Sequence, residues 1–212
     1  MKERQIPENT NHESRRSRSR SRKPVILIIA EGKNVTERNY FGSFRKQHAG
    51  YVLKCPDIGH VTDPANMMKA ANDYWIKNKM SKSKGDAAFV VMDLDCSEQK
   101  AATINKLTSK RNHASFIVSN PCFEAWFLTH FLYPVGSFTS SSVITALRKY
   151  IPGYKKNSDV SRYINGSNLN QALQNADNLA LRCIASGLSW PSPECNPRTD
   201  VPDVIREIQK HP

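Results

Sequence analysis

The chain has 212 residues, of which 39% are hydrophobic and 24% are charged, a composition typical of a globular protein with polar additions. No apolar run approaches the roughly 20 residues that a membrane-spanning helix needs, so we expect no membrane association. The formal net charge is +12, which favours polyanionic partners such as nucleic acid without identifying one.

Five cysteines are scattered along the chain, and no two of them form a Cys-x-x-Cys pair. An odd number at irregular spacing indicates neither a disulfide framework nor a structural zinc site. The N-terminus is polar and charged, so we expect no secretory signal. Together these features predict a cytoplasmic protein with free thiols.

Residues 1–24 hold eight Lys or Arg and three Glu, with almost no branched apolar or aromatic side chains. Such a segment cannot bury enough surface to offset the cost of ordering it, so we expect a disordered Ser/Arg-rich basic tail. One interpretation is a solvated tail. The other is an arm that binds phosphate backbones through its arginines, Arg15, Arg16, Arg18, Arg20 and Arg22. Lys33, further along, is another candidate for contact with nucleic acid.

The stretch from residue 25 to residue 44 predicts a buried strand followed by a helix. Residues 25–29 (VILII) form an unbroken, β-branched apolar run, which is typical of a strand buried on both faces. Glu31 and a glycine end this strand. Thr36 can cap the following helix, and Glu37 lies in its first turn, where the helix dipole favours an acid.

Short apolar strands and helices alternate along the next hundred residues. We expect strands at 51–55, 87–92 and 115–118, a helix that begins at Pro64, and another over 98–111. This alternation indicates an α/β fold with a central, mostly parallel four-stranded sheet flanked by helices. Further helices are expected at about 141–150, 168–186 and 200–210. We therefore predict an α/β core over 25–133 and a helical C-terminal part over 134–212.

Three acids end buried strands in this prediction. Glu31 follows the first strand, and Asp93 and Asp95 follow the strand at 87–92. Alternation along an extended chain would place Asp93 and Asp95 on the same side. Carboxylates that converge repel one another unless a cation or protons neutralise them, and oxygen ligands suit Mg²⁺ or Mn²⁺. The structural alternative is that these acids cap helices or pair with lysines.

Residues 119–131 (SNPCFEAWFLTHF) predict another strand-to-helix junction. Asn120 can cap the helix and Pro121 can be its first residue. Glu124 then lies near a strand end, beside an apolar face that includes His130. A lone histidine on such a face is usually a core residue, and a capping role alone would explain Asn120.

Five segments resemble the RloB-like family in the same order along the chain. They are residues 31–41 (EGKNVTERNYF), 93–95 (DLD), 119–131, 154–156 (YKK) and 196–201 (NPRTDV). The resemblance covers residues 25–210 and leaves out the basic tail.

The resemblance implies a Toprim-like domain with a metal site built from Glu31, Asp93 and Asp95. It also implies that Glu37 and Glu124 are further catalytic candidates. By the same transfer Lys155 or Lys156 would stabilise charge on a phosphate, although both lysines can equally be solvated. It finally implies a link with restriction and anti-phage defence, and a second protein from the same locus as a partner.

Three functions are compatible with these features. The first is a nuclease dependent on Mg²⁺ or Mn²⁺ that cleaves DNA or RNA, in anti-phage defence. The second is a non-catalytic component that binds nucleic acid or a protein partner, because fold does not dictate chemistry. The third, a strand-rejoining or nucleotidyl-transfer enzyme, ranks last, since strand rejoining would need a nucleophilic tyrosine on a separate domain.

Overall fold

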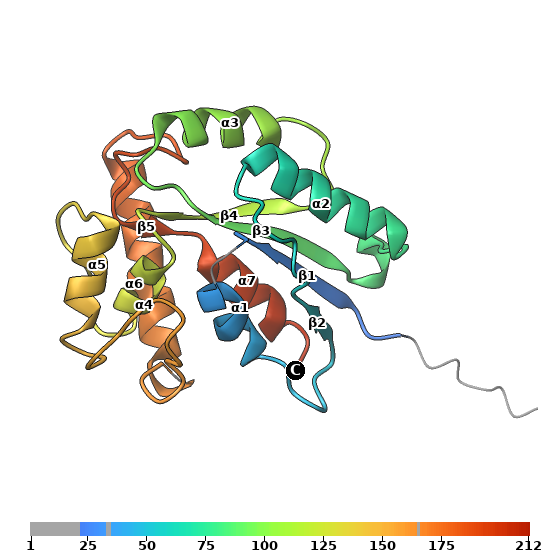
Figure 1. The fold of residues 1–212 in the computed structure, drawn as a ribbon, viewed down its shortest axis with the longest axis horizontal. Helices are drawn as coiled ribbons and strands as arrows, with labels where there is room; N and C mark the ends of the chain where they lie inside the picture. The colour runs from blue at the N-terminus through green and yellow to red at the C-terminus, as the bar shows by residue number, and fades with distance from the viewer. Residues whose placement is uncertain (1–21, 33–34, 165) are drawn as a thin grey trace, which may run out of the picture.

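A computed structural model describes residues 22–32, 35–164 and 166–212 of the chain (Figure 1). Its centre is a five-stranded sheet with the strand order β2-β1-β3-β4-β5. The first four strands in the chain run parallel, and β5 pairs antiparallel with β4. The strands are β1 (Val25–Ala30), β2 (Val52–Lys54), β3 (Ala87–Asp93), β4 (Ser115–Asn120) and β5 (Arg198–Thr199).

Helices cover both faces of the sheet (Figure 1). One face is covered by α2 and α3, and the other by α1 and α7, with α4, α5 and α6 beyond them. The helices are α1 (Val35–Gly42), α2 (Pro64–Lys77), α3 (Glu98–Thr108), α4 (Glu124–Thr129), α5 (Ser140–Leu147), α6 (Gly166–Ala185) and α7 (Val201–Gln209), with a 3₁₀ turn, η1, at Lys82–Lys84. Among the described residues, no helix has the length and apolar character needed to cross a bilayer.

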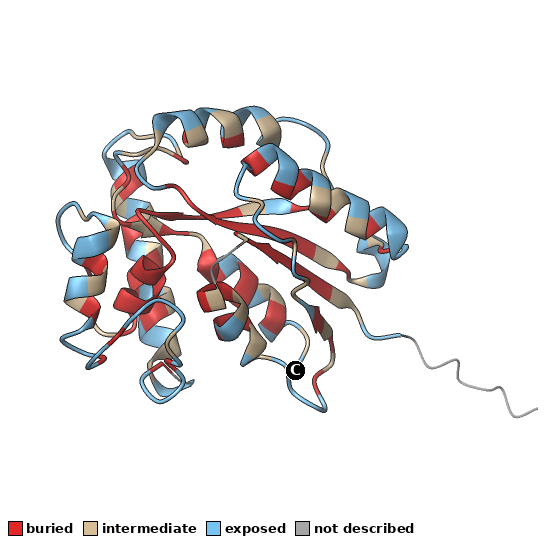
Figure 2. Cartoon of the chain, in the orientation of Figure 1, coloured by how far each residue is buried: buried red, intermediate tan, exposed pale blue. Residues whose placement is uncertain are grey.

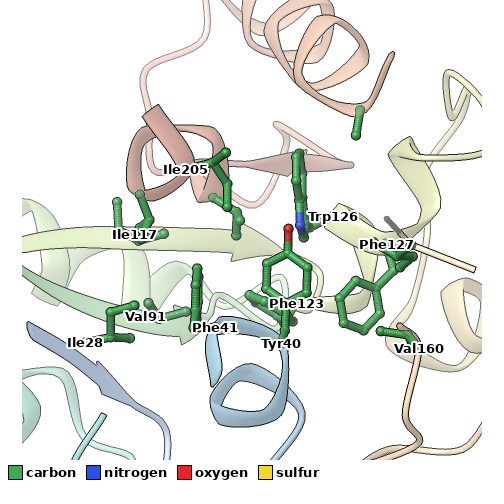
Figure 3. Close-up of a cluster of buried hydrophobic side chains, with 14 of the residues drawn as sticks. Ile28, Tyr40, Phe41, Val91, Ile117, Phe123, Trp126, Phe127, Val160 and Ile205 are labelled. Atoms are coloured by element: carbon green, nitrogen blue, oxygen red, sulfur yellow. The ribbon is translucent and has the colours of Figure 1, made fainter. Parts of the chain in front are cut away.

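The apolar run of β1 is buried on both sides because successive side chains of a strand point to opposite faces. Ile26 and Ile28 join the core under α1 and α7, whereas Leu27 and Ile29 join the core under α2 and α3. Figure 2 shows the resulting band of buried residues along the sheet. The core under α1 and α7 is rich in aromatic rings from α1 and α4, which Figure 3 shows packed together.

The predicted fold class is confirmed, with one addition to the sheet. The mostly parallel α/β core and the C-terminal helices are both present. The sheet has five strands rather than four, because residues 198–199 return from the helical part and pair with the end of β4. A two-residue strand carries no hydrophobic pattern, so it could not be predicted from the sequence.

The prediction of free thiols is wrong for two cysteines. Cys183 and Cys195 form a disulfide, with their Cα atoms 5.5 Å apart. The chain folds back after α6, so two residues that are 12 apart in sequence meet. Cys55, Cys96 and Cys122 are free, as expected.

The predicted role of Asn120 as a helix cap is also wrong. Asn120 is the last residue of β4, and α4 begins only at Glu124. Its amide instead links two loops. Oδ1 accepts a hydrogen bond from the Cys96 backbone at 3.1 Å, and Nδ2 donates to the carbonyls of Pro193 and Cys195, each at 3.0 Å.

Candidate active site

The carboxyl ends of β1, β3 and β4 lie at one edge of the sheet, and the predicted acids gather there. Ala30 pairs with Val91 across β1 and β3, so Glu31 lies close to the level of Asp93 at the end of β3. Asp93 in turn pairs with Ser119 across β3 and β4. In open α/β sheets this edge is where ligands bind.

Two helices bring further carboxylates to this edge. Glu37 lies in the first turn of α1 and is 2% exposed, and Glu124 begins α4 and is 1% exposed. Asp93 is affected by all of them: its pKa is raised well above the ordinary value, first by burial and then by the charges of neighbouring glutamates. We call this group the acidic cluster; its members are Glu31, Glu37, Asp93 and Glu124.

Hydrogen bonds satisfy the acidic cluster only in part. The Phe123 backbone N–H donates to Asp93 Oδ1 at 2.7 Å, and the Tyr154 hydroxyl donates to Glu124 Oε1 at 3.2 Å. The other oxygens of two carboxylates, Glu37 Oε2 and Glu124 Oε2, are buried and have no hydrogen-bond partner among the described residues. Buried carboxylate oxygens without partners are costly, so the site has unused capacity to bind a cation or a proton.

The electrostatics of the cluster favour protonation when no other cation is bound. Burial, reinforced by the charges of Glu124 and Glu31, raises the pKa of Glu37 to about 8. Burial also raises the pKa of Glu31, although the charge of Lys100 opposes it. Like charges in a poorly solvated site account for both directions.

Asp95 lies just beyond the end of β3, so the strand alternation from which we predicted its position does not extend to it, although its charge still contributes to the raised pKa of Asp93. The strand ends at Asp93, and Asp95 adopts a positive φ of 54° in the turn that follows. Its backbone N–H donates to the Pro121 carbonyl at 2.9 Å. The Asp95 side chain is 51% exposed and pairs with Lys100.

Lys100 is a site residue that the sequence analysis missed. Its ammonium Nζ donates to Asp95 Oδ2 at 2.6 Å, to the Asp93 carbonyl at 3.0 Å and to Glu31 Oε1 at 3.3 Å. Partial burial lowers the pKa of Lys100, but the two carboxylates outweigh that effect and raise it. A signal was available, because a lysine in the first turn of a helix runs against the helix dipole and so suggests an acidic partner.

The two candidate lysines after α5 differ in their position relative to the cluster. Partial burial lowers the pKa of Lys156, but the charges of Glu124 and Asp93 raise it by more. Lys156 is therefore close enough to interact electrostatically with the acidic cluster, although the residue as a whole is exposed. Lys155 is exposed, and its backbone N–H donates to the Ser158 hydroxyl at 3.0 Å.

His130 is a core residue in this structure. It is 4% exposed, and its Nδ1 donates to the Trp126 carbonyl at 3.1 Å. Burial lowers the pKa of His130 to about 4, so the ring is neutral at physiological pH.

Most residues predicted to contact nucleic acid lie outside the described residues. These are Arg15, Arg16, Arg18, Arg20 and Lys33. Arg22 is described, and its guanidinium forms a salt bridge with the buried carboxylate of Asp86. This salt bridge holds Arg22 next to the residue that precedes β3.

The donor chemistry of the site suits a hard divalent cation. Its donors are carboxylate oxygens, which Mg²⁺ and Mn²⁺ prefer, and two of those oxygens are buried with no hydrogen-bond partner in the described part of the chain. Within residues 22–32, 35–164 and 166–212, no three His, Cys, Asp or Glu side chains already have an arrangement that could hold one ion. The ammonium group of Lys100 instead forms ion pairs with both Glu31 and Asp95. Charge and donor type therefore fit such a cation.

The chain was compared with protein families, curated proteins and solved structures. No curated protein and no solved structure shows significant similarity to the chain. The family model described as "RloB-like protein" matches residues 26–208, a range that includes every residue of the acidic cluster. The chain therefore belongs to the RloB-like family.

Proposed function

We propose that this chain is a nuclease dependent on Mg²⁺ or Mn²⁺ that hydrolyses phosphodiester bonds in DNA or RNA. The observation that carries the proposal is the acidic cluster, in which four buried carboxylates from separate elements meet at the carboxyl edge of the sheet, where open α/β folds bind their ligands. Such an arrangement is unfavourable unless positive charge or protons neutralise it. Perturbed carboxylates at this position are typical of a catalytic site.

In this proposal Glu31, Asp93 and Asp95 would hold the divalent cation. When bound, the cation supplies activation of water and stabilisation of the leaving oxygen. Asp93 is fixed for this role by its bond from the Phe123 backbone, whereas Asp95 is more exposed and is held by its ion pair with Lys100.

The chain's own side chains divide the remaining work. Glu124 is oriented by Tyr154, and with Glu37 it is placed to orient water or accept its proton. Glu37 holds a proton at neutral pH before a cation binds, because its pKa is about 8. Lys156 is the better of the two lysines to face a scissile phosphate, since the acidic cluster already attracts it.

Membership of the RloB-like family supports the biological setting that the resemblance implied. We propose that the protein acts in the cytoplasm in anti-phage defence, with a second protein of the same locus as a partner. The net charge of +12 supports nucleic acid as the substrate class.

The test is cleavage of labelled DNA and RNA by the full chain with Mg²⁺, with EDTA, and with substituted variants. Glu31→Gln should abolish cleavage while leaving nucleic-acid binding in place. The matched control is Glu98→Gln, which removes an exposed acid from the start of α3 and should cleave normally. Cleavage that persists in Glu31→Gln would end the proposal.

A second candidate function is a non-catalytic component that binds nucleic acid or a protein partner. The observation that favours it is Lys100, whose ammonium already neutralises part of the acidic edge. A binding component would retain nucleic-acid affinity in EDTA and in Glu31→Gln, and would show no cleavage under any condition.

A further inference from the structure

Lys100 occupies a position that its own helix does not favour. It lies in the first turn of α3, three residues after the cap Ser97, whose hydroxyl accepts the Lys100 backbone N–H at 3.2 Å. The positive end of the helix dipole disfavours a cation there. The favourable energy must come from the acceptors around Nζ, which belong to the ends of β1 and β3.

These acceptors have the chemistry of cation ligands. Nζ is bonded to two carboxylate oxygens, from Glu31 and Asp95, and to one backbone carbonyl, from Asp93. Oxygen atoms of these two kinds bind hard divalent cations in proteins. An ammonium and a divalent cation repel each other and would compete for the same carboxylate oxygens, so both cannot be bonded to those oxygens of Glu31 and Asp95 at once.

We propose that Lys100 is the built-in counter-ion of the resting site, and that a divalent cation binds by displacing its ammonium from Glu31 and Asp95. This inference rests on the proposed function, because it assumes that the site takes a divalent cation. It accounts for a site whose carboxylates fit a cation by chemistry while no three of them, among the described residues, are already arranged around one.

The displaced side chain has space available next to it. A cavity of about 320 Å³ lies beside Lys100, lined also by Thr62, Asp63, Ser97 and Thr103. Asp63 provides a carboxylate in the lining of this cavity. Its side chain is held there as the cap of α2, where it accepts the Asn66 N–H at 2.9 Å. A lysine has the length and the rotamer freedom to move its ammonium from one set of oxygens to the other.

The test is titration of the full chain with Mn²⁺, followed by electron paramagnetic resonance. Lys100→Met keeps most of the apolar stem and removes the competing charge. We expect Mn²⁺ to bind about tenfold more tightly to Lys100→Met than to the wild type, within the usual range for coupled sites. The matched control is Lys106→Met, which removes an exposed lysine from the same helix and should leave the affinity unchanged.

A second measurement needs no substitution. The rate of acylation of each lysine in the wild type is followed by mass spectrometry, with and without Mg²⁺. Displacement predicts that Mg²⁺ speeds the labelling of Lys100 relative to Lys106. This measurement decides the matter if Lys100→Met does not fold.

The outcomes separate the two proposals. If the wild type binds Mn²⁺ through Glu31 but Lys100→Met binds it equally or more weakly, the counter-ion role is wrong and the nuclease proposal stands. Slower labelling of Lys100 in Mg²⁺ overturns the counter-ion role in the same way. If neither the wild type nor Lys100→Met binds Mn²⁺, both proposals are wrong.

Discussion

The two ends of β3 carry buried aspartates in opposite circumstances. Asp86 immediately precedes the strand and Asp93 ends it, and each is 4% exposed. At Asp86, burial alone would raise the pKa, but hydrogen bonds from Arg22 and from two backbone N–H groups lower it below the ordinary value. At Asp93, burial and neighbouring acids raise the pKa well above that value.

The difference teaches how to distinguish a structural acid from a candidate catalytic one. Asp86 accepts the N–H of Val25 at 2.8 Å and that of Ser81 at 2.7 Å, and it also binds the Arg22 guanidinium. These bonds hold the start of β1 next to the start of β3. Asp93 accepts the Phe123 N–H at 2.7 Å, and its charged neighbours are mostly other acids, which Lys156 offsets only in part. Burial is therefore no guide to function until the partners are examined.

Asp93→Asn should give the largest effect on activity. It removes a charge from the acidic cluster, so cleavage should fall by about a hundredfold or more, as expected when a metal site is impaired. The folded state should be unchanged or slightly more stable, because the variant no longer buries an ionisable group among other acids. Initial cleavage rates and thermal unfolding of the same preparation check both expectations. A rate close to that of the wild type would show that Asp93 is not a site residue.

Asp86→Asn should act in the opposite way. An asparagine places an NH₂ group against backbone donors and loses the charge that binds Arg22. We expect a loss of about 2 kcal/mol in the free energy of unfolding, which is typical of buried hydrogen bonds left unmade. Urea unfolding measures it, while cleavage per folded molecule should remain normal. Loss of cleavage in a folded Asp86→Asn protein would remove the contrast between the two ends.

The acidic cluster at one end of β3 and Asp86 at the other should also differ in how pH affects the stability of the protein. Glu37 has a folded pKa of about 8 against an ordinary value of 4.5, so its stabilising contribution is full in acid and is lost as the pH rises through this interval. Asp86 has a lowered pKa, so its contribution is present at neutral pH and is lost in acid, below its ordinary value of 3.8. Glu37→Gln should therefore flatten the decline in melting temperature between about pH 5 and pH 8, measured in EDTA. An identical decline in the variant would contradict the assignment.

The smallest expected effect concerns the basic tail. Removal of residues 1–21, which leaves the Arg22–Asp86 pair in place, should weaken nucleic-acid binding and reduce its dependence on salt. Fluorescence anisotropy at several salt concentrations gives the slope. An unchanged slope would mean that the tail does not contact phosphates.

The fold could be predicted largely because β1, β3 and β4 are apolar runs between polar turns. The same runs place Glu31 and Asp93 at strand ends, so their meeting followed from the topology of a parallel sheet. The exact position of Asp95 could not be predicted, because it depends on where β3 stops and on a turn with a positive φ.

Other features depend on contacts between distant segments, and no local pattern identifies the partners. Asn120 bonds to Cys195, 75 residues away, and Lys100 bonds to Glu31, 69 residues away. The Cys183–Cys195 disulfide likewise depends on the path of the chain after α6. Such pairings become visible only when the packing of the whole chain is known.

The most direct test of the central claim is the binding of Mn²⁺ to the full chain and to Asp93→Asn, measured by calorimetry at neutral pH. If separate elements of the fold assemble a divalent-cation site, the wild type should bind Mn²⁺ and the variant should lose that binding while remaining folded. Equal binding by both proteins, or no binding by the wild type, would contradict the account.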